Sequence, residues 1–241
     1  MTLVSDLALR LLFGLAAALL PLPSRQIPPA FFRTLHWIAL GLAVLAAVDL
    51  FVHAAPEFAR IAIVGCAVLA YLASVAWGLG LPRLGWPLTA ALTLGATLLV
   101  DGSRGPSAPP LERAAGLVSG LYLGTLLCAM LLGHHYLTAP SMSIQPLVSA
   151  IRSAGLALLA RAGLALAALA ALRPAHPSSL LLLMRWGLGL AAPAVGLFLA
   201  HRTARIRSTQ SATGILYATL ILALLGELAS LVLARSTAVT Y

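Results

Sequence analysis

Long apolar runs recur along almost the whole chain, and they restrict its fold more than any other feature. Prolines, arginines or short polar segments separate eight such runs, at 8–22, 34–54, 61–81, 87–100, 114–137, 147–172, 179–200 and 212–234. A helix needs about 20 residues to cross an apolar layer about 30 Å thick. The pattern predicts an all-α polytopic membrane protein with about eight transmembrane helices, of which the first and fourth are short for spanning.

Composition excludes the main alternatives. The 241 residues are 61% hydrophobic and 9% charged, whereas a soluble domain carries roughly 25% charged residues and a disordered chain is poor in apolar residues. The longest polar stretch, 101–113, divides the chain into two membrane halves of four helices each, at 1–100 and 114–241. Little of the chain is left for a soluble domain.

The distribution of arginine predicts the orientation. All 15 basic residues are arginines, and they lie mostly singly at the ends of the runs, which favours contact with lipid headgroups over nucleic acid. The one dense basic segment extends from His201 to Arg207. Because basic loops tend to remain in the cytoplasm, we expect a bacterial cytoplasmic (inner) membrane protein with both termini outside.

Four ionisable residues inside the runs are the first candidates for function, because charge at this depth is costly. A rise of about 1.5 Å per residue places Asp49, Arg161, Arg185 and Glu227 about 21–22 Å from the same membrane face. Two acids and two bases at one depth predict a charge layer. It either fixes helix packing or forms a proton, ion or quinone-headgroup site. His53, one helical turn after Asp49, suggests a proton entry or a solvated interfacial histidine.

A second group of candidates lies near the opposite face. Imidazoles at helix ends can ligate haem iron or hydrogen-bond a quinone, and they are equally at home at the membrane interface. The candidates for haem or quinone contact are His36, His134, His135, Tyr136 and His201. We predict no separate metal site, because no carboxylate lies near His134 in the sequence.

Gly116, Gly120 and Gly124 form a GxxxGxxxG series, which allows another helix to approach closely. The helix at 147–172, with Gly155 and Gly163, is the candidate neighbour. This series predicts packing and no chemistry. Nucleotide-binding, zinc-protease and serine-hydrolase signatures are absent from the sequence, so we do not expect catalysis by the chain alone.

Three functions therefore remain open. The preferred one is a membrane subunit of a larger respiratory or redox complex, which anchors partner subunits and contributes a quinone contact or a proton pathway, with haem b or quinone as the cofactor. The second is a small transporter or permease that uses the charge layer as its midplane site. The third is an assembly or scaffold protein without a small-molecule site.

Overall fold

The computed structural model describes the chain except residues 1, 106, 140–141, 173–177 and 238–241, and every regular element in the described part is a helix. The connection between the predicted runs at 147–172 and 179–200 therefore lies almost entirely outside the described residues. In chain order the helices are α1 (Leu3–Leu19), α2 (Pro29–Val52), α3 (Glu57–Gly78), α4 (Pro82–Gly102), α5 (Pro110–Thr138), α6 (Gln145–Leu172), α7 (Ser179–Leu183), the π-helical η1 (Met184–Ala191), α8 (Ala192–Arg205) and α9 (Thr209–Thr237).

Prolines mark where several of these helices begin. Pro29, Pro82 and Pro110 are the first residues of α2, α4 and α5. A proline in the first turn loses no hydrogen bond, because the N–H groups there have no partner within the helix. The fourth helix therefore starts five residues before the predicted run at 87–100, and its 21 residues are enough to span.

The predicted count of eight membrane-spanning helices is not established, because α1 is short. Within the described residues, seven helices are long and apolar enough to cross a membrane. The 17 residues of α1 measure about 26 Å, less than the roughly 30 Å apolar layer. Most of α1 is buried among other helices rather than facing outward. Its length is therefore less constrained by the lipid than the lengths of its neighbours.

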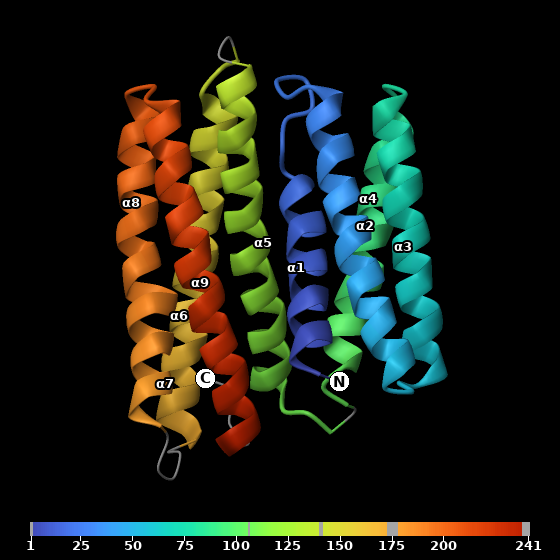
Figure 1. Ribbon diagram of the computed structural model, residues 1–241, viewed down its shortest axis with the longest axis vertical. Helices are drawn as coiled ribbons and strands as arrows, with labels where there is room; N and C mark the ends of the chain where they lie inside the picture. Colours follow the sequence, from blue (N-terminus) through green and yellow to red (C-terminus); the bar gives the residue numbers. More distant parts are fainter. Residues whose placement is uncertain (1, 106, 140–141, 173–177, 238–241) are drawn as a thin grey trace.

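The helices form two groups that lie side by side (Figure 1). In the first group α1, α2, α3 and α4 each contact the next helix, and α4 returns to α1. In the second group α5, α6, α8 and α9 follow the same order, and α9 returns to α5. The groups meet mainly where α1 packs against α5. Because each group has four long rods, α1 begins and α9 ends at the same end of the bundle (Figure 1).

Glycines allow the close contact between α1 and α5. A Cβ atom on Gly14 would collide with the backbone of Gly120, and one on Gly124 would collide with the backbone of Gly14. The expected neighbour of this glycine series was the sixth helix, but its Gly155 and Gly163 face open space. The structure places α1 there instead, because Gly14 supplies the second smooth surface that backbone-to-backbone approach requires.

The π-helical segment η1 interrupts the long rod formed by α7 and α8. Gly189 of η1 packs directly against Gly226 of α9, where a Cβ on either residue would overlap the other backbone. The hydroxyl of Tyr122 in α5 donates a 2.9 Å hydrogen bond to the carbonyl oxygen of Gly189. Single π-turns in helices often occur at functional sites, and this one lies beside the buried charges described next.

Candidate functional site: a buried arginine–glutamate cluster

Glu227 of α9 is fully buried and is the centre of the largest buried polar group. Arg161 of α6 binds both carboxylate oxygens, with Nε 2.9 Å from Oε1 and Nη2 3.2 Å from Oε2. Arg185 of η1 donates from Nη1 to Oε1 at 2.8 Å, and the hydroxyl of Ser119 donates to Oε2 at 2.6 Å. A carboxylate that accepts four such bonds is well compensated for its loss of water.

Arg10 links this carboxylate to the other helix group. Its Nη1 donates to the Ser119 hydroxyl at 2.9 Å and lies 3.8 Å from Glu227 Oε2. We call Glu227, Ser119, Arg10, Arg161 and Arg185 the arginine–glutamate cluster. Four of its members belong to the second group, and Arg10 belongs to α1 of the first group. The cluster therefore spans the junction between the two groups.

A chain of ion pairs connects the cluster to one end of the bundle. Arg10 also binds Asp6 at 2.9 Å, and Asp6 accepts from Arg104 in the α4–α5 connection at 3.2 Å. Arg104 lies 3.7 Å from Glu112. Exposure of the side chains falls from 32% at Glu112 to 10% at Arg104 and 4% at Arg10. Burial lowers the pKa of the Arg104 guanidinium and so does the charge of Arg10, whereas Asp6 and Glu112 raise it.

Arg185 is the member of the cluster whose hydrogen-bonding capacity is least used. Its side chain is fully buried, and only Nη1 has a partner, whereas Nε and Nη2 are buried without a hydrogen-bond acceptor among the described residues. Buried charged donors are costly when they have no partner. Such donors are suited to a small anion or to ordered water. A guanidinium presents Nε and one terminal nitrogen as a fork that matches two oxygens of one anion.

The local backbone explains how Arg185 reaches this position. Arg185 is the second residue of η1, six residues after the start of the rod at Ser179, which is about 9 Å along a helix. The contact of Gly189 with Gly226 brings η1 against α9 next to Glu227. Arg185 Nη1 lies against the same glycine, 3.4 Å from the place where a Cβ of Gly189 would be. Small residues on both helices thus make room for the guanidinium.

Asp49 does not join the other three members of the predicted charge layer. It lies in α2, which packs mainly against α1 and α3 and has no extensive contact with η1 or α9 among the described residues. Its Oδ1 accepts a 2.8 Å hydrogen bond from Thr2 and lies 3.3 Å from Nδ1 of the half-exposed His53. Equal depth in the membrane places residues on one level but leaves open their positions around the bundle. The expected proximity of Asp49 and His53 is present.

The candidate haem and quinone contacts have separate surroundings. His36 is buried between α2 and α4, where Nε2 lies 3.0 Å from the Thr89 hydroxyl. His134 is exposed and lies 3.4 Å from the Tyr217 hydroxyl, whereas the His135 ring stands 5.6 Å from that of Phe31. Two further candidates have other neighbours: Tyr136 donates to the backbone of Ser143, and His201 lines a groove between α6 and α8. Among the described residues, no hydrogen bond or ring contact joins any two of the five side chains, and only the chain neighbours His134 and His135 interact electrostatically.

Sequence reasoning missed Arg10, Ser119 and Ser230 as partners of the buried charges. The predicted first run begins at residue 8, so Arg10 falls at its edge, where an arginine is typical of the membrane surface. The Thr2 hydroxyl accepts from the backbone N–H groups of Val4 and Ser5, so the helix starts at Leu3 and carries Arg10 inward. The spacing of four residues between Asp6 and Arg10 could have indicated this, because residues four apart form an ion pair on one face of a helix.

No protein-family model, curated protein or solved structure matches this chain.

Proposed function

We propose that the protein is a small membrane carrier that binds a small anionic solute at Arg185, within the arginine–glutamate cluster. The observation that carries the proposal is the pair of buried, unaccepted donors on Arg185, Nε and Nη2. An anion with two oxygens would accept both donors and would lie against a cluster that holds three guanidiniums around one carboxylate. Binding there would remove the cost of leaving these donors without partners.

The position of the cluster supports a carrier. Substrate sites of many transporters lie inside the membrane where two structural halves meet, and the cluster lies at such a junction, about 9 Å along the rod from Ser179. Arg10 belongs to one helix group and Glu227 to the other, and they approach to 3.8 Å through the α1–α5 junction. Binding or release of an anion at Arg185 would change the electrostatic balance at this junction. Solute binding would thereby be coupled to the relative position of the two groups.

The experiment compares the parent with Arg185→Lys. Lysine retains the positive charge beside Glu227 but lacks the planar fork of donors. The two purified proteins are heated in the presence of chloride, nitrate, phosphate or acetate at constant ionic strength. Uptake of the radiolabelled anion that stabilises best is then measured in proteoliposomes. We expect at least one of these anions to raise the Tm of the parent and to be taken up, and both effects to be lost in Arg185→Lys.

Two results would contradict the carrier. One is a parent whose Tm does not respond to any of the four anions. The other is an Arg185→Lys variant that is stabilised by the anion as strongly as the parent. Arg83→Gln is the control for general charge effects, because Arg83 is exposed at the start of α4. This variant should respond to anions as the parent does.

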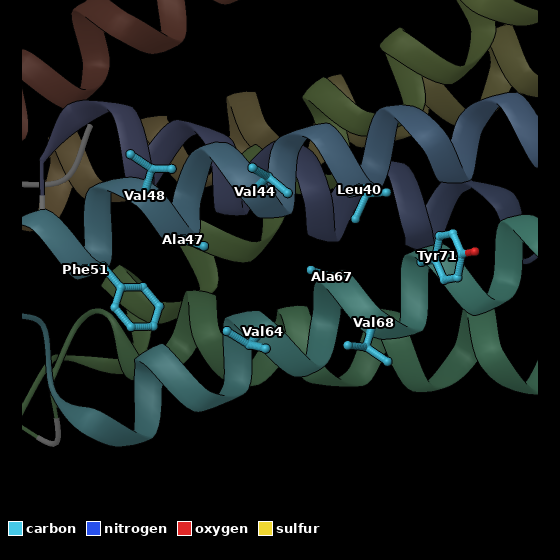
Figure 2. A pocket seen from close by; sticks show the side chains of 9 residues that line it. All are labelled: Leu40, Val44, Ala47, Val48, Phe51, Val64, Ala67, Val68 and Tyr71. Carbon is cyan, nitrogen blue, oxygen red and sulfur yellow. The ribbon is translucent and has the colours of Figure 1, made fainter.

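A membrane subunit of a larger respiratory or redox complex is the second candidate. The observation that favours it is an apolar groove of about 560 Å³ between α2 and α3, which has Phe51 and Tyr71 at its two ends (Figure 2). A partner with little contact area outside the membrane would have to bind such a surface, because the described connections between helices are short. Quinone contact, a proton pathway and location in a bacterial cytoplasmic membrane belong to this proposal.

Gentle extraction distinguishes the candidates. The protein is purified in mild detergent, its co-purifying polypeptides are identified, its visible spectrum is recorded and quinone is extracted. Haem absorbance or quinone in stoichiometric amount, together with partner polypeptides, would favour the redox subunit. Polypeptides alone would favour an assembly or scaffold protein. A lone chain that transports an anion would support the carrier.

A further inference from the structure

A groove of about 490 Å³ runs between α6 and α8, on the second helix group. Its apolar part includes Leu156 and Leu159 of α6 and Phe198 of α8, all of them exposed. Gly155 lies in the groove wall, and a Cβ placed there would contact nothing within 4 Å. The absence of a side chain at this position deepens the groove, which is suited to an alkyl chain.

One end of the groove is basic. Arg152 and His201 line it there, and Arg205 is close enough to interact electrostatically with His201. His201 Nδ1 is buried without a hydrogen-bond partner among the described residues. Arg202 lies beside this end, with its guanidinium 5.8 Å from the centre of the Phe198 ring. Basic side chains here surround the mouth of an otherwise apolar groove.

The acidic residues of the chain do not balance this basic end. Arg152 lies in the first third of α6, and His201 lies in the last turns of α8, so both are near the connection between α8 and α9. The six acidic residues are Asp6, Asp49, Glu57, Asp101, Glu112 and Glu227. Five of them lie at the end of the bundle that is opposite to the basic end of the groove. Glu227 is 18 residues into α9, about 27 Å along that helix from the connection between α8 and α9.

We propose that this groove is a binding site for one anionic glycerophospholipid, with an acyl chain along Leu156 and Leu159 and its phosphate at Arg152 and His201. The apolar wall matches the acyl chain, and the basic end of the groove, near the helix ends, matches the phosphate. A lipid in a membrane has the same arrangement, with its acyl chain inside and its phosphate at the surface. A zwitterionic lipid would fit the wall equally well, but its choline or ethanolamine would meet uncompensated positive charge. This site is independent of the anion site proposed at Arg185.

The test measures lipid binding to the full chain. The protein is reconstituted in phosphatidylcholine nanodiscs with or without phosphatidylglycerol, its Tm is recorded, and retained lipid is identified by native mass spectrometry. We expect phosphatidylglycerol to raise the Tm and to remain bound. Arg152→Gln removes one charge-assisted contact and should weaken this binding about tenfold. Gly155→Leu fills the groove and should abolish retention of the lipid.

Matched controls separate the groove from general membrane effects. Gly163→Leu adds the same side chain to the same helix, at an exposed glycine outside the groove. Arg83→Gln removes an exposed charge near the same end of the bundle, in the first helix group. Both variants should bind phosphatidylglycerol as the parent does. Should Gly155→Leu fail to fold, Arg152→Gln with its control Arg83→Gln still decides the proposal.

Four outcomes would overturn the lipid site. A parent that does not prefer phosphatidylglycerol to phosphatidylcholine has no such site. Equal losses in Arg152→Gln and Arg83→Gln would mean diffuse attraction to an anionic surface. Retention of phosphatidylglycerol by folded Gly155→Leu would place the lipid elsewhere. A Tm increase of the same size with inorganic phosphate in phosphatidylcholine nanodiscs, lost in Arg152→Gln and kept in Arg185→Lys, would indicate a free-anion site in the groove.

Discussion

Arg185 and Glu227 lie 42 residues apart in the chain and meet in the interior of the bundle, where both side chains are fully buried and Arg185 Nη1 donates a 2.8 Å hydrogen bond to Glu227 Oε1. The same carboxylate oxygen accepts from Arg161 Nε. One acidic side chain therefore joins η1, α6 and α9, and the Ser119 hydroxyl extends the connection to α5. The stability of the second helix group should depend strongly on this carboxylate.

Replacing Glu227 with glutamine tests that dependence. The amide keeps the shape of the side chain but leaves the buried arginines without their shared negative charge. Removal of one partner from a buried ion pair costs about 3–5 kcal/mol, so we expect a large fall in Tm and in yield. Unfolding in detergent, followed by circular dichroism, measures the change. A variant as stable as the parent would mean that water reaches the cluster.

Asp49→Asn is the matched comparison, because Asp49 has the same predicted depth but different surroundings. It is bound to the Thr2 hydroxyl and lies beside the half-exposed His53. An asparagine can still accept the hydrogen bond from Thr2, and the partner left behind is not a buried arginine. We expect a loss of at most about 1 kcal/mol in the free energy of unfolding. A loss equal to that of Glu227→Gln would contradict the separation of Asp49 from the cluster.

The sequence predicts part of this cluster for a clear physical reason. Glu227, Arg161 and Arg185 interrupt apolar runs, and charges in such runs have to find partners. Depth along a helix follows from residue number, so their common level could be calculated. The angular position of each helix in the bundle does not follow from residue number. For this reason Asp49, on the same level, could not be separated from the other three.

The contribution of α1 was harder to predict. Arg10 is polar and lies near the start of an apolar run, so hydropathy alone assigns it to the surface. Its position depends on the Thr2 cap, on the Asp6 ion pair and on the contact of Gly14 with Gly124. The last of these is a contact between residues 110 positions apart. The glycine series predicted a close helix neighbour, and only the three-dimensional packing identifies that neighbour as α1.

Gly124→Leu tests the junction between the two helix groups. A Cβ at this position would overlap the backbone of Gly14, and the rest of a leucine would force α1 away from α5. Overpacking of a tight contact costs typically 1–3 kcal/mol, and displacement of α1 would also move Arg10 from Ser119. The control is Gly41→Leu on α2, where a Cβ contacts nothing within 4 Å. We expect a fall in Tm for Gly124→Leu only. Equal Tm values for the two variants would mean that α1 and α5 do not pack closely at Gly124.

The last prediction concerns whether α1 crosses the membrane although it is only 17 residues long. If it crosses, the start of α1 and the connection after α4 lie on one side, and the connections after α1 and α8 lie on the other (Figure 1). Val4→Cys places a thiol at the exposed start of α1, and Gln26→Cys, Ser103→Cys and Ser208→Cys place one in each of the three connections of the full chain. The native Cys66 and Cys128 are buried, so a membrane-impermeant maleimide should not label the parent.

The basic segment from His201 to Arg207 predicts which side each thiol occupies. Intact cells should label Val4→Cys and Ser103→Cys, whereas Gln26→Cys and Ser208→Cys should be labelled only after permeabilisation. The reverse pattern in all four would invert the orientation and leave eight crossings. If Val4→Cys and Gln26→Cys were labelled from the same side, α1 would not cross the membrane. The buried α1 would then be a re-entrant or interfacial helix, because both of its ends would lie at one face of the membrane.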